Sequence, residues 1–339
     1  METKFSAKDY KSDQYVRWCP GCGDHAVVNT LQKAMAEIGI APHETAVISG
    51  IGCSSRLAYY MNTYGFHTIH GRGLAIATGV KTANPKLAVW SITGDGDCLA
   101  IGGNHFIHAL RRNVDINILL LNNKIYGLTK GQYSPTSDRG VVSKTSPYGT
   151  VEDPFVPAEL AFGARASFYA RALDVDLSLS KDVMVAAASH KGASFVEILQ
   201  NCVIFSDGVH KHISAKETRL DRIVVLEHGK PMIFGVNRDK GIVFENFKLK
   251  AVTIGQDGYT VDDILVHDAK MEEPFLHQQL GLMGVRNQDG MPVACGVIRC
   301  VDAPAYDEAV EAQIAEVQAV KKERTLMDFL RTQSTWEVK

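Results

Sequence analysis

Acidic and amide side chains stand beside glycines at two places, about one strand–helix–strand unit apart. The first is Gly94-Asp95-Gly96-Asp97 and the second is Asn122-Asn123. Glycines let backbone N–H groups approach phosphate oxygens, and Mg²⁺ prefers oxygen ligands in octahedral geometry. A carboxylate from Asp95 and an amide oxygen from Asn123 therefore predict a site for a magnesium-bound diphosphate. The alternative is an ordinary turn in which Asp95 only caps a helix.

The elements around these residues predict a doubly wound α/β fold with a mostly parallel sheet. Apolar runs indicate buried strands over 45–49, 87–93, 115–121 and 194–199. Helical patterns lie over 26–38, 54–62, 73–83, 101–112, 158–164 and 181–190. Asp95 and Asn123 each follow a strand, so both are expected at the carboxyl edge of the sheet, where open α/β sheets bind ligands. Residues 126–157 are too long for a passive connection and predict a functional loop.

Four of the seven cysteines form a second group. Cys19 and Cys22 stand in Trp-Cys-Pro-Gly-Cys-Gly, where the small neighbours let two thiolates converge on one metal centre. Cys53 and Cys202 follow predicted strands, so we expect them at the same sheet edge as the diphosphate site. Zinc and an iron–sulfur cluster both fit such a group, and a structural or dithiol role is the alternative. The other three cysteines are expected to be structural: Cys98, Cys295 and Cys300.

The composition is that of an ordinary globular protein. The 339 residues are 45% hydrophobic and 22% charged, with a formal net charge of −2. This balance gives no electrostatic support to a nucleic-acid or anionic-membrane partner, and no apolar run approaches the length of a membrane span. Without a secretory pattern or a disulfide framework, we expect a cytoplasmic protein. Residues 1–210 carry both sites, and residues 211–339 are expected to form a C-terminal extension that acts as a lid or subunit contact.

Together these motifs resemble the β subunit of the bacterial and archaeal 2-oxoacid:ferredoxin oxidoreductases. The resemblance covers most of residues 15–210. Its segments are Trp-Cys-Pro-Gly-Cys-Gly at 18–23, Gly-Ile-Gly-Cys-Ser-Ser at 50–55, His-Gly-Arg at 70–72, Gly-Asp-Gly-Asp at 94–97, Ile-Gly-Gly-Asn-His at 101–105, and Asn-Asn-Lys-Ile-Tyr-Gly-Leu-Thr-Lys-Gly-Gln at 122–132. Residues 101–135 are most similar to the 2-oxoglutarate branch. The resemblance implies the diphosphate-binding half of a thiamine-diphosphate fold, with Mg²⁺ and a [4Fe–4S] cluster.

The resemblance also implies roles for individual residues. The implied Mg²⁺ ligands are Asp95, Asn123 and the carbonyl of Ile125, and the implied cluster ligands are Cys19, Cys22, Cys53 and Cys202. Cofactor contacts are implied for Ile51, Gly52, Cys53, Ser54, Gly94, Gly96, Asp97, Tyr126, Gly127 and Leu128. His70 resembles a cofactor-side histidine that hydrogen-bonds substrate or diphosphate, although a structural histidine is the alternative. Arg56 resembles the residue that binds the distal carboxylate of 2-oxoglutarate, and the alternatives are a surface arginine or a coenzyme A phosphate contact.

The implied reaction is oxidative decarboxylation of 2-oxoglutarate with coenzyme A to succinyl-CoA and CO₂, in either direction, with ferredoxin as electron acceptor. No glutamate for the aminopyrimidine ring is recognisable, so the family pattern implies an α subunit that supplies it, in an αβ dimer or an (αβ)₂ assembly. Three alternatives stay open. The substrate is pyruvate or another 2-oxoacid, the chain is half of a non-redox thiamine enzyme with zinc on its cysteines, or it is a non-catalytic iron–sulfur carrier.

Overall fold

A central sheet organises the chain, whose computed structural model describes residues 5–285, 290–320, 325–331, 336 and 338. In this described part the main sheet has eight strands in the order β2-β1-β3-β4-β8-β7-β13-β9. Their bounds are Tyr64–His67 (β2), Thr45–Ser49 (β1), Ala88–Gly94 (β3), Asn117–Asn122 (β4), Ser194–Leu199 (β8), Phe168–Leu173 (β7), Val293–Cys300 (β13) and Ile223–Leu226 (β9). Neighbouring strands run parallel except β13 and β7, which pair antiparallel.

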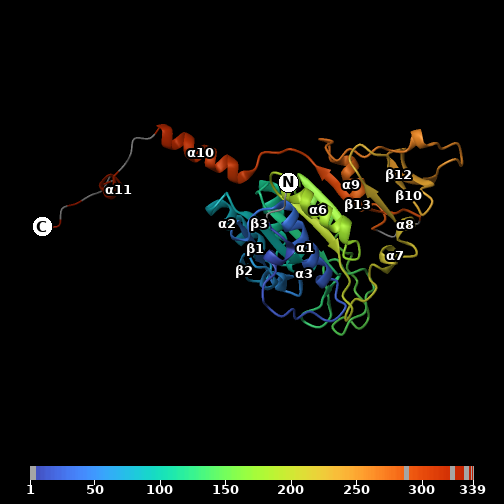
Figure 1. The fold of residues 1–339 in the computed structure, drawn as a ribbon, viewed down its shortest axis with the longest axis horizontal. Helices are drawn as coiled ribbons and strands as arrows, with labels where there is room; N and C mark the ends of the chain where they lie inside the picture. The colour runs from blue at the N-terminus through green and yellow to red at the C-terminus, as the bar shows by residue number, and fades with distance from the viewer. Residues whose placement is uncertain (1–4, 286–289, 321–324, 332–335, 337, 339) are drawn as a thin grey trace.

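Helices cover both faces of this sheet, as the doubly wound pattern predicts (Figure 1). The packing helices are α1 (Asp24–Ile38), α2 (Gly73–Ala83), α4 (Gly103–Arg112), α5 (Pro157–Gly163), α6 (Leu177–Ser189) and α9 (Phe275–Leu282). Helices α1 and α6 contribute to one buried apolar cluster, whereas α2, α4, α5 and α9 contribute to another. Successive residues of β4 alternate between them, since Leu120 belongs to one cluster and Leu121 to the other. The predicted fold class is therefore confirmed.

Most predicted elements lie close to their expected bounds, and two differences have physical causes. The segment predicted as a helix over 54–62 is the 3₁₀ helix η3 (Ser54–Tyr60), which lies in the connection between the adjacent parallel strands β1 and β2. Strand β7 was not predicted, because Arg171 interrupts its apolar run. That arginine is 1% exposed and has an ionic partner on β8, so burial patterns alone do not reveal the strand.

The C-terminal part contributes to the main sheet and also forms structure of its own. Strands β9 and β13 extend the main sheet, so the sheet continues beyond residue 210. A separate three-stranded sheet contains β10 (Ile233–Phe234), β11 (Lys240–Glu245) and β12 (Lys248–Thr253). Short helices α7 (Lys211–Ser214), α8 (Arg219–Arg222) and η4 (Val261–Asp263) lie in the same region. Helices α10 (Tyr306–Val320) and α11 (Leu326–Leu330) extend away from the body (Figure 1).

The remaining elements are short. They are η1 (Ala7–Tyr10), η2 (Pro42–Glu44), α3 (Asp95–Leu99), β5 (Ile125–Tyr126) and β6 (Gln132–Tyr133). Within the described residues, no helix combines the length and hydropathy that a membrane crossing requires.

Candidate cofactor and metal site

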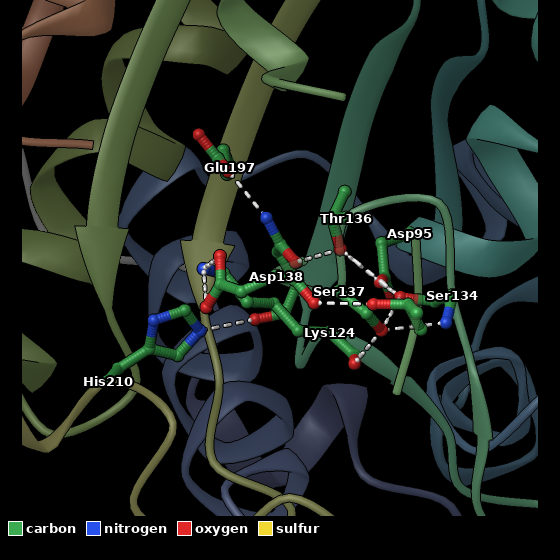
Figure 2. Close-up of polar contacts among 10 residues, drawn as sticks. Asp95, Lys124, Ser134, Thr136, Ser137, Asp138, Glu197 and His210 are labelled. Carbon is green, nitrogen blue, oxygen red and sulfur yellow. Dashed lines mark hydrogen bonds and ion pairs between the residues drawn. The ribbon is translucent and has the colours of Figure 1, made fainter. Parts of the chain in front are cut away.

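Asp95 is a buried carboxylate at the carboxyl end of β3. It is 2% exposed, and it opens α3, whose N-cap position is Gly94. The hydroxyl oxygens of Ser134 and Thr136 each lie 2.5 Å from Asp95 Oδ2 (Figure 2). Burial raises the pKa of Asp95, and hydrogen bonds from these two hydroxyls oppose the rise. Gly94 and not Asp95 is the N-cap of α3, and the Asp95 carboxylate accepts hydrogen bonds from a later loop in addition to its place in the first turn of the helix.

The two asparagines after β4 have different surroundings. The buried Asn122 donates from Nδ2 to Glu197 Oε1 at 2.8 Å, and its Oδ1 lies 3.0 Å from the Thr136 hydroxyl. Asn123 lies just beyond the strand, and its Oδ1 accepts from the backbone N–H of Ile125 at 3.2 Å. The expected donors Asn123 and Ile125 thus lie directly after Asn122, whose amide oxygen and Asp95 Oδ2 both contact the Thr136 hydroxyl.

Asp97 holds the glycine-rich loops around the site. Its Oδ1 accepts from the backbone N–H groups of Ile51 at 3.0 Å and Gly71 at 2.7 Å. Its Oδ2 accepts from the Thr93 hydroxyl at 2.9 Å, and His70 Nδ1 lies 2.9 Å from Oδ1. Because both oxygens have partners within the protein, Asp97 positions the loops of Ile51 and His70 against the Gly-Asp-Gly turn.

Tyr126 packs directly on that turn. A Cβ atom at Gly96 would lie 2.2 Å from the tyrosine ring, so glycine is required for this approach. The Tyr126 hydroxyl donates to the Gly96 carbonyl at 3.0 Å, and its ring meets the His70 ring edge-on with centroids 6.2 Å apart. Burial raises the pKa of Tyr126 to about 12, so this phenol stays neutral and can donate. The loop segment expected to cover a cofactor therefore closes on the expected diphosphate turn.

The next residue of the same loop reaches the cysteine group. A Cβ atom at Gly127 would lie 3.6 Å from Cys53 Sγ and 3.6 Å from Cys202 Sγ. Burial raises the pKa of Cys22, and the charges of Cys202 and Cys53 add to this effect. Burial raises the pKa of Cys53 to about 12, with further contributions from Cys202 and Cys19. The four cysteines predicted as a group are therefore close enough to influence one another.

Hydrogen bonds to backbone carbonyls hold this group at the strand ends. The N–H of Gly23 donates to the Asn201 carbonyl at 3.2 Å, which joins the Cys-x-x-Cys turn to the segment after β8. The Trp18 indole N–H donates to the Cys53 carbonyl at 2.7 Å. By contrast, Cys98 is buried in α3, and Cys295 and Cys300 lie on β13.

The donor sets match the expected groups. Thiolates suit iron–sulfur clusters, whereas carboxylate, amide and carbonyl oxygens suit Mg²⁺. In the described parts of the chain, no three His, Cys, Asp or Glu side chains are gathered as a single-ion site requires. The four cysteines offer thiolates that a [4Fe–4S] cluster and zinc both accept.

The other predicted residues lie around the two centres. Gly52 has φ +124°, a conformation that glycine adopts readily, and Ser54 Oγ would lie 3.0 Å from a Cβ atom at Gly94. Arg56 lies on η3 beside the cysteines, where its backbone N–H donates to the Cys53 carbonyl and its charge lowers the pKa of that thiol. Leu128 is 42% exposed.

Several polar residues at the site were not predicted from the sequence. They are Ser134, Thr136, Glu197, Arg171 and His210, which joins the network by a 2.9 Å contact between its Nε2 and the Asn122 carbonyl (Figure 2). Glu197 is a charged residue inside the otherwise apolar run over 194–199, and it was the feature of the sequence that could have indicated these residues. A glutamate in a buried strand requires a partner, and such a partner points to a specialised site.

Known proteins are similar to this chain in sequence and in fold. Residues 50–198 match the family described as thiamine pyrophosphate enzyme, C-terminal TPP binding domain. The chain is 46% identical to the 2-oxoglutarate oxidoreductase subunit KorB of Mycobacterium tuberculosis, over 98% of this chain and 88% of that protein. It is 42% identical to the 2-oxoglutarate synthase subunit KorB of Archaeoglobus fulgidus, over 68% of this chain and 86% of that protein.

A solved structure shows a similar fold over nearly the whole chain. The 2-oxoglutarate:ferredoxin oxidoreductase from Magnetococcus marinus, with 2-oxoglutarate, coenzyme A and succinyl-CoA bound, superimposes with a TM-score of 0.76 and 31% identity. The match covers 97% of both chains. The resemblance found in the motifs is thus confirmed, and the chain belongs to the β subunits of the 2-oxoacid:ferredoxin oxidoreductases, in the 2-oxoglutarate branch.

Proposed function

We propose that this β subunit binds thiamine diphosphate through Mg²⁺, carries a [4Fe–4S] cluster, and takes part in the interconversion of 2-oxoglutarate and coenzyme A with succinyl-CoA and CO₂. Electrons would pass through the cluster to ferredoxin. The names of the relatives and the ligands of the Magnetococcus marinus enzyme support this substrate set. The position of Gly127 is the observation that carries the proposal, because it joins the loop over the diphosphate turn to two of the cysteines.

In this proposal each group of residues has a defined task. Thiamine diphosphate, when bound, supplies the stabilised carbanion that decarboxylation of a 2-oxoacid needs. Asp95, Asn123 and the Ile125 carbonyl would hold Mg²⁺, and Asp97 keeps the neighbouring loops in place. Tyr126 covers the turn and donates its hydroxyl to the Gly96 carbonyl. The four cysteines would hold the cluster close to this loop, which shortens the path for electrons.

The site needs a second subunit to be complete. Thiamine chemistry requires a glutamate on the aminopyrimidine ring, and the buried Glu197 is already bound to Arg171, Tyr169 and Asn122. We therefore propose an α subunit that supplies this glutamate. The isolated chain is expected to bind Mg²⁺–thiamine diphosphate weakly and to show no 2-oxoacid oxidation, and co-expression with the α subunit is expected to restore both. A coupled assay with several 2-oxoacids measures this, and activity of the chain alone would contradict it.

Metal analysis of the same αβ complex distinguishes an iron–sulfur cluster from zinc. Iron and acid-labile sulfide analysis, with absorbance near 400 nm, separates a [4Fe–4S] cluster from zinc. A colourless zinc protein that binds thiamine diphosphate would instead favour a non-redox enzyme half. A brown protein that does not bind thiamine diphosphate would favour the electron carrier.

Arg56 gives a test of substrate choice. Replacing it by alanine is expected to raise KM for 2-oxoglutarate much more than for pyruvate, because a guanidinium binds a distal carboxylate that pyruvate lacks. Steady-state kinetics of the αβ complex with both substrates measures the difference. Its place beside Cys53 predicts a second effect, since loss of a nearby positive charge is expected to lower the cluster potential. Equal KM changes for both substrates would leave Arg56 with the electrostatic role alone.

A further inference from the structure

We propose that Glu197 is a positioning residue for the magnesium site and acts through Asn122 and Thr136. This inference rests on the proposed function, in which Asp95 holds the cation that binds thiamine diphosphate. Figure 2 shows the residues that connect the two carboxylates across the carboxyl end of the sheet.

The chain of contacts begins at a buried ion pair. Arg171 and Glu197 face each other on β7 and β8, are 1% and 2% exposed, and have Nε and Oε2 2.9 Å apart. Tyr169 donates its hydroxyl to the same Oε2 at 2.6 Å. Burial opposes ionisation, yet the Arg171 charge and the hydrogen bonds from Tyr169 and Asn122 hold the pKa of Glu197 below its usual range. One carboxylate oxygen is therefore occupied by the ion pair, and Oε1 is left for Asn122.

The Oε1 atom of Glu197 fixes the orientation of the Asn122 amide. An ionised carboxylate only accepts hydrogen bonds, so the amide nitrogen of Asn122 must face it, at 2.8 Å. The amide oxygen then points to the opposite side, toward Thr136. A flipped amide would place two acceptors against each other in a buried environment, which is costly.

Asn122 in turn determines how Thr136 presents its hydroxyl. The Thr136 oxygen lies 3.0 Å from Asn122 Oδ1 and 2.5 Å from Asp95 Oδ2, but a hydroxyl has one hydrogen to donate. Asp95 has a second donor in Ser134, whereas among the residues that the structure describes Asn122 Oδ1 has Thr136 alone. We infer that the Thr136 hydrogen is shared by the two acceptors, so that Asn122 Oδ1 draws it partly away from Asp95. The lone pairs of Thr136 then face the same space as the Asp95 carboxylate, and both are oxygen donors suited to a hard cation.

The C-terminal part of the chain supports this arrangement. Arg171 Nη2 donates to the carbonyl of Gly281 at 2.9 Å, and Nη1 to the carbonyl of Ala294 at 3.4 Å. These carbonyls belong to α9 and β13. The segment that joins the sheet from beyond residue 210 therefore helps to fix the ion pair from which the site is oriented.

The Glu197→Gln variant tests the direction of these hydrogen bonds. The glutamine oxygen can accept from Arg171 and Tyr169, and its amide nitrogen then faces Asn122. The Asn122 amide must flip, and the Thr136 hydrogen, no longer shared with Asn122, turns wholly toward Asp95. Volume and hydrogen-bond number are kept while the polarity of the site is reversed. In the αβ complex we expect about tenfold weaker Mg²⁺-dependent thiamine diphosphate binding, as for other residues behind metal ligands.

Three further variants complete the test. Thr136→Val is expected to weaken binding by a similar factor, Thr136→Ser to stay within about twofold of wild type, and Glu197→Gln in the Thr136→Val background to add nothing. Titration calorimetry gives the binding constants, and Mn²⁺ electron paramagnetic resonance is expected to show altered coordination in both weakened variants. Melting temperatures identify any variant whose fold is damaged.

The results distinguish failure of the Glu197 positioning role from failure of the proposed magnesium site. A folded Glu197→Gln protein with wild-type affinity and an unchanged Mn²⁺ spectrum would overturn the positioning role, as would independent, additive effects of Glu197→Gln and Thr136→Val. If Glu197→Gln fails to fold, Asn122→Ala takes its place, and wild-type affinity there overturns the proposal. Asp95→Asn is the reference variant. If it too retains full cation-dependent binding, the proposed magnesium site itself is wrong.

Discussion

Replacing Cys202 by serine is expected to remove the iron–sulfur cluster and to abolish ferredoxin reduction, while thiamine diphosphate binding persists. Cys202 lies beside the Gly127 backbone, and its charge acts on both Cys22 and Cys53. A serine hydroxyl is a far weaker ligand for iron than a thiolate, so the cluster should be lost or left with three irons. Iron and sulfide content, absorbance near 400 nm and the thiamine diphosphate binding constant of the αβ complex measure the two effects separately.

Cys300→Ser is the matched control for this prediction. Cys300 lies on β13 and is also partly exposed, but its neighbour is His190, with Sγ 3.8 Å from Nδ1. The control is expected to keep full iron content and activity. If Cys202→Ser retains four irons per β subunit, or if Cys300→Ser loses them, the assignment of cluster ligands is wrong.

The sequence was informative wherever a local pattern decides the structure. Strands β1 and β8 have the bounds that their apolar runs predict, because a strand buried on both faces is mostly apolar, with Glu197 as the one charged residue of β8. The edge strand β2 escaped prediction since all four of its residues are exposed. Nothing local indicates that strand β13 pairs antiparallel with β7, more than 100 residues earlier in the chain.

The same distinction holds for the candidate site. Asp95 and the four cysteines follow strand ends or occupy a short motif, so their neighbourhood was predictable from the order of elements. The partners of Asn122 were not. Glu197 reaches it from another strand, and Thr136 comes from a loop whose path depends on tertiary contacts. Which of several polar residues turn inward is settled by hydrogen-bond pairing in the folded core, and a single sequence does not display that pairing.

Two neighbouring aspartates provide the sharpest test of how the diphosphate turn works. Asp95→Asn is expected to weaken Mg²⁺-dependent thiamine diphosphate binding at least about 100-fold, or about 2.7 kcal/mol, because a charged oxygen ligand becomes a neutral one. Its melting temperature should stay near that of the wild type, since an asparagine oxygen can still accept from Ser134 or Thr136. Activity of the αβ complex should fall with binding and recover in part at high Mg²⁺.

Asp97→Ala is expected to act through the fold instead. Its loss leaves the part-buried N–H of Ile51 and the buried N–H of Gly71 without their acceptor, and the buried group alone costs about 1–3 kcal/mol. The melting temperature should therefore fall, and binding should weaken because the loops move. Asp97→Asn, which keeps an acceptor for both N–H groups, should restore most of the stability, whereas no rise in Mg²⁺ concentration should rescue the alanine variant. Calorimetry with a Mg²⁺ series distinguishes the two aspartates, and equal responses from both would mean that they share one role, contrary to the separate partners that each one has.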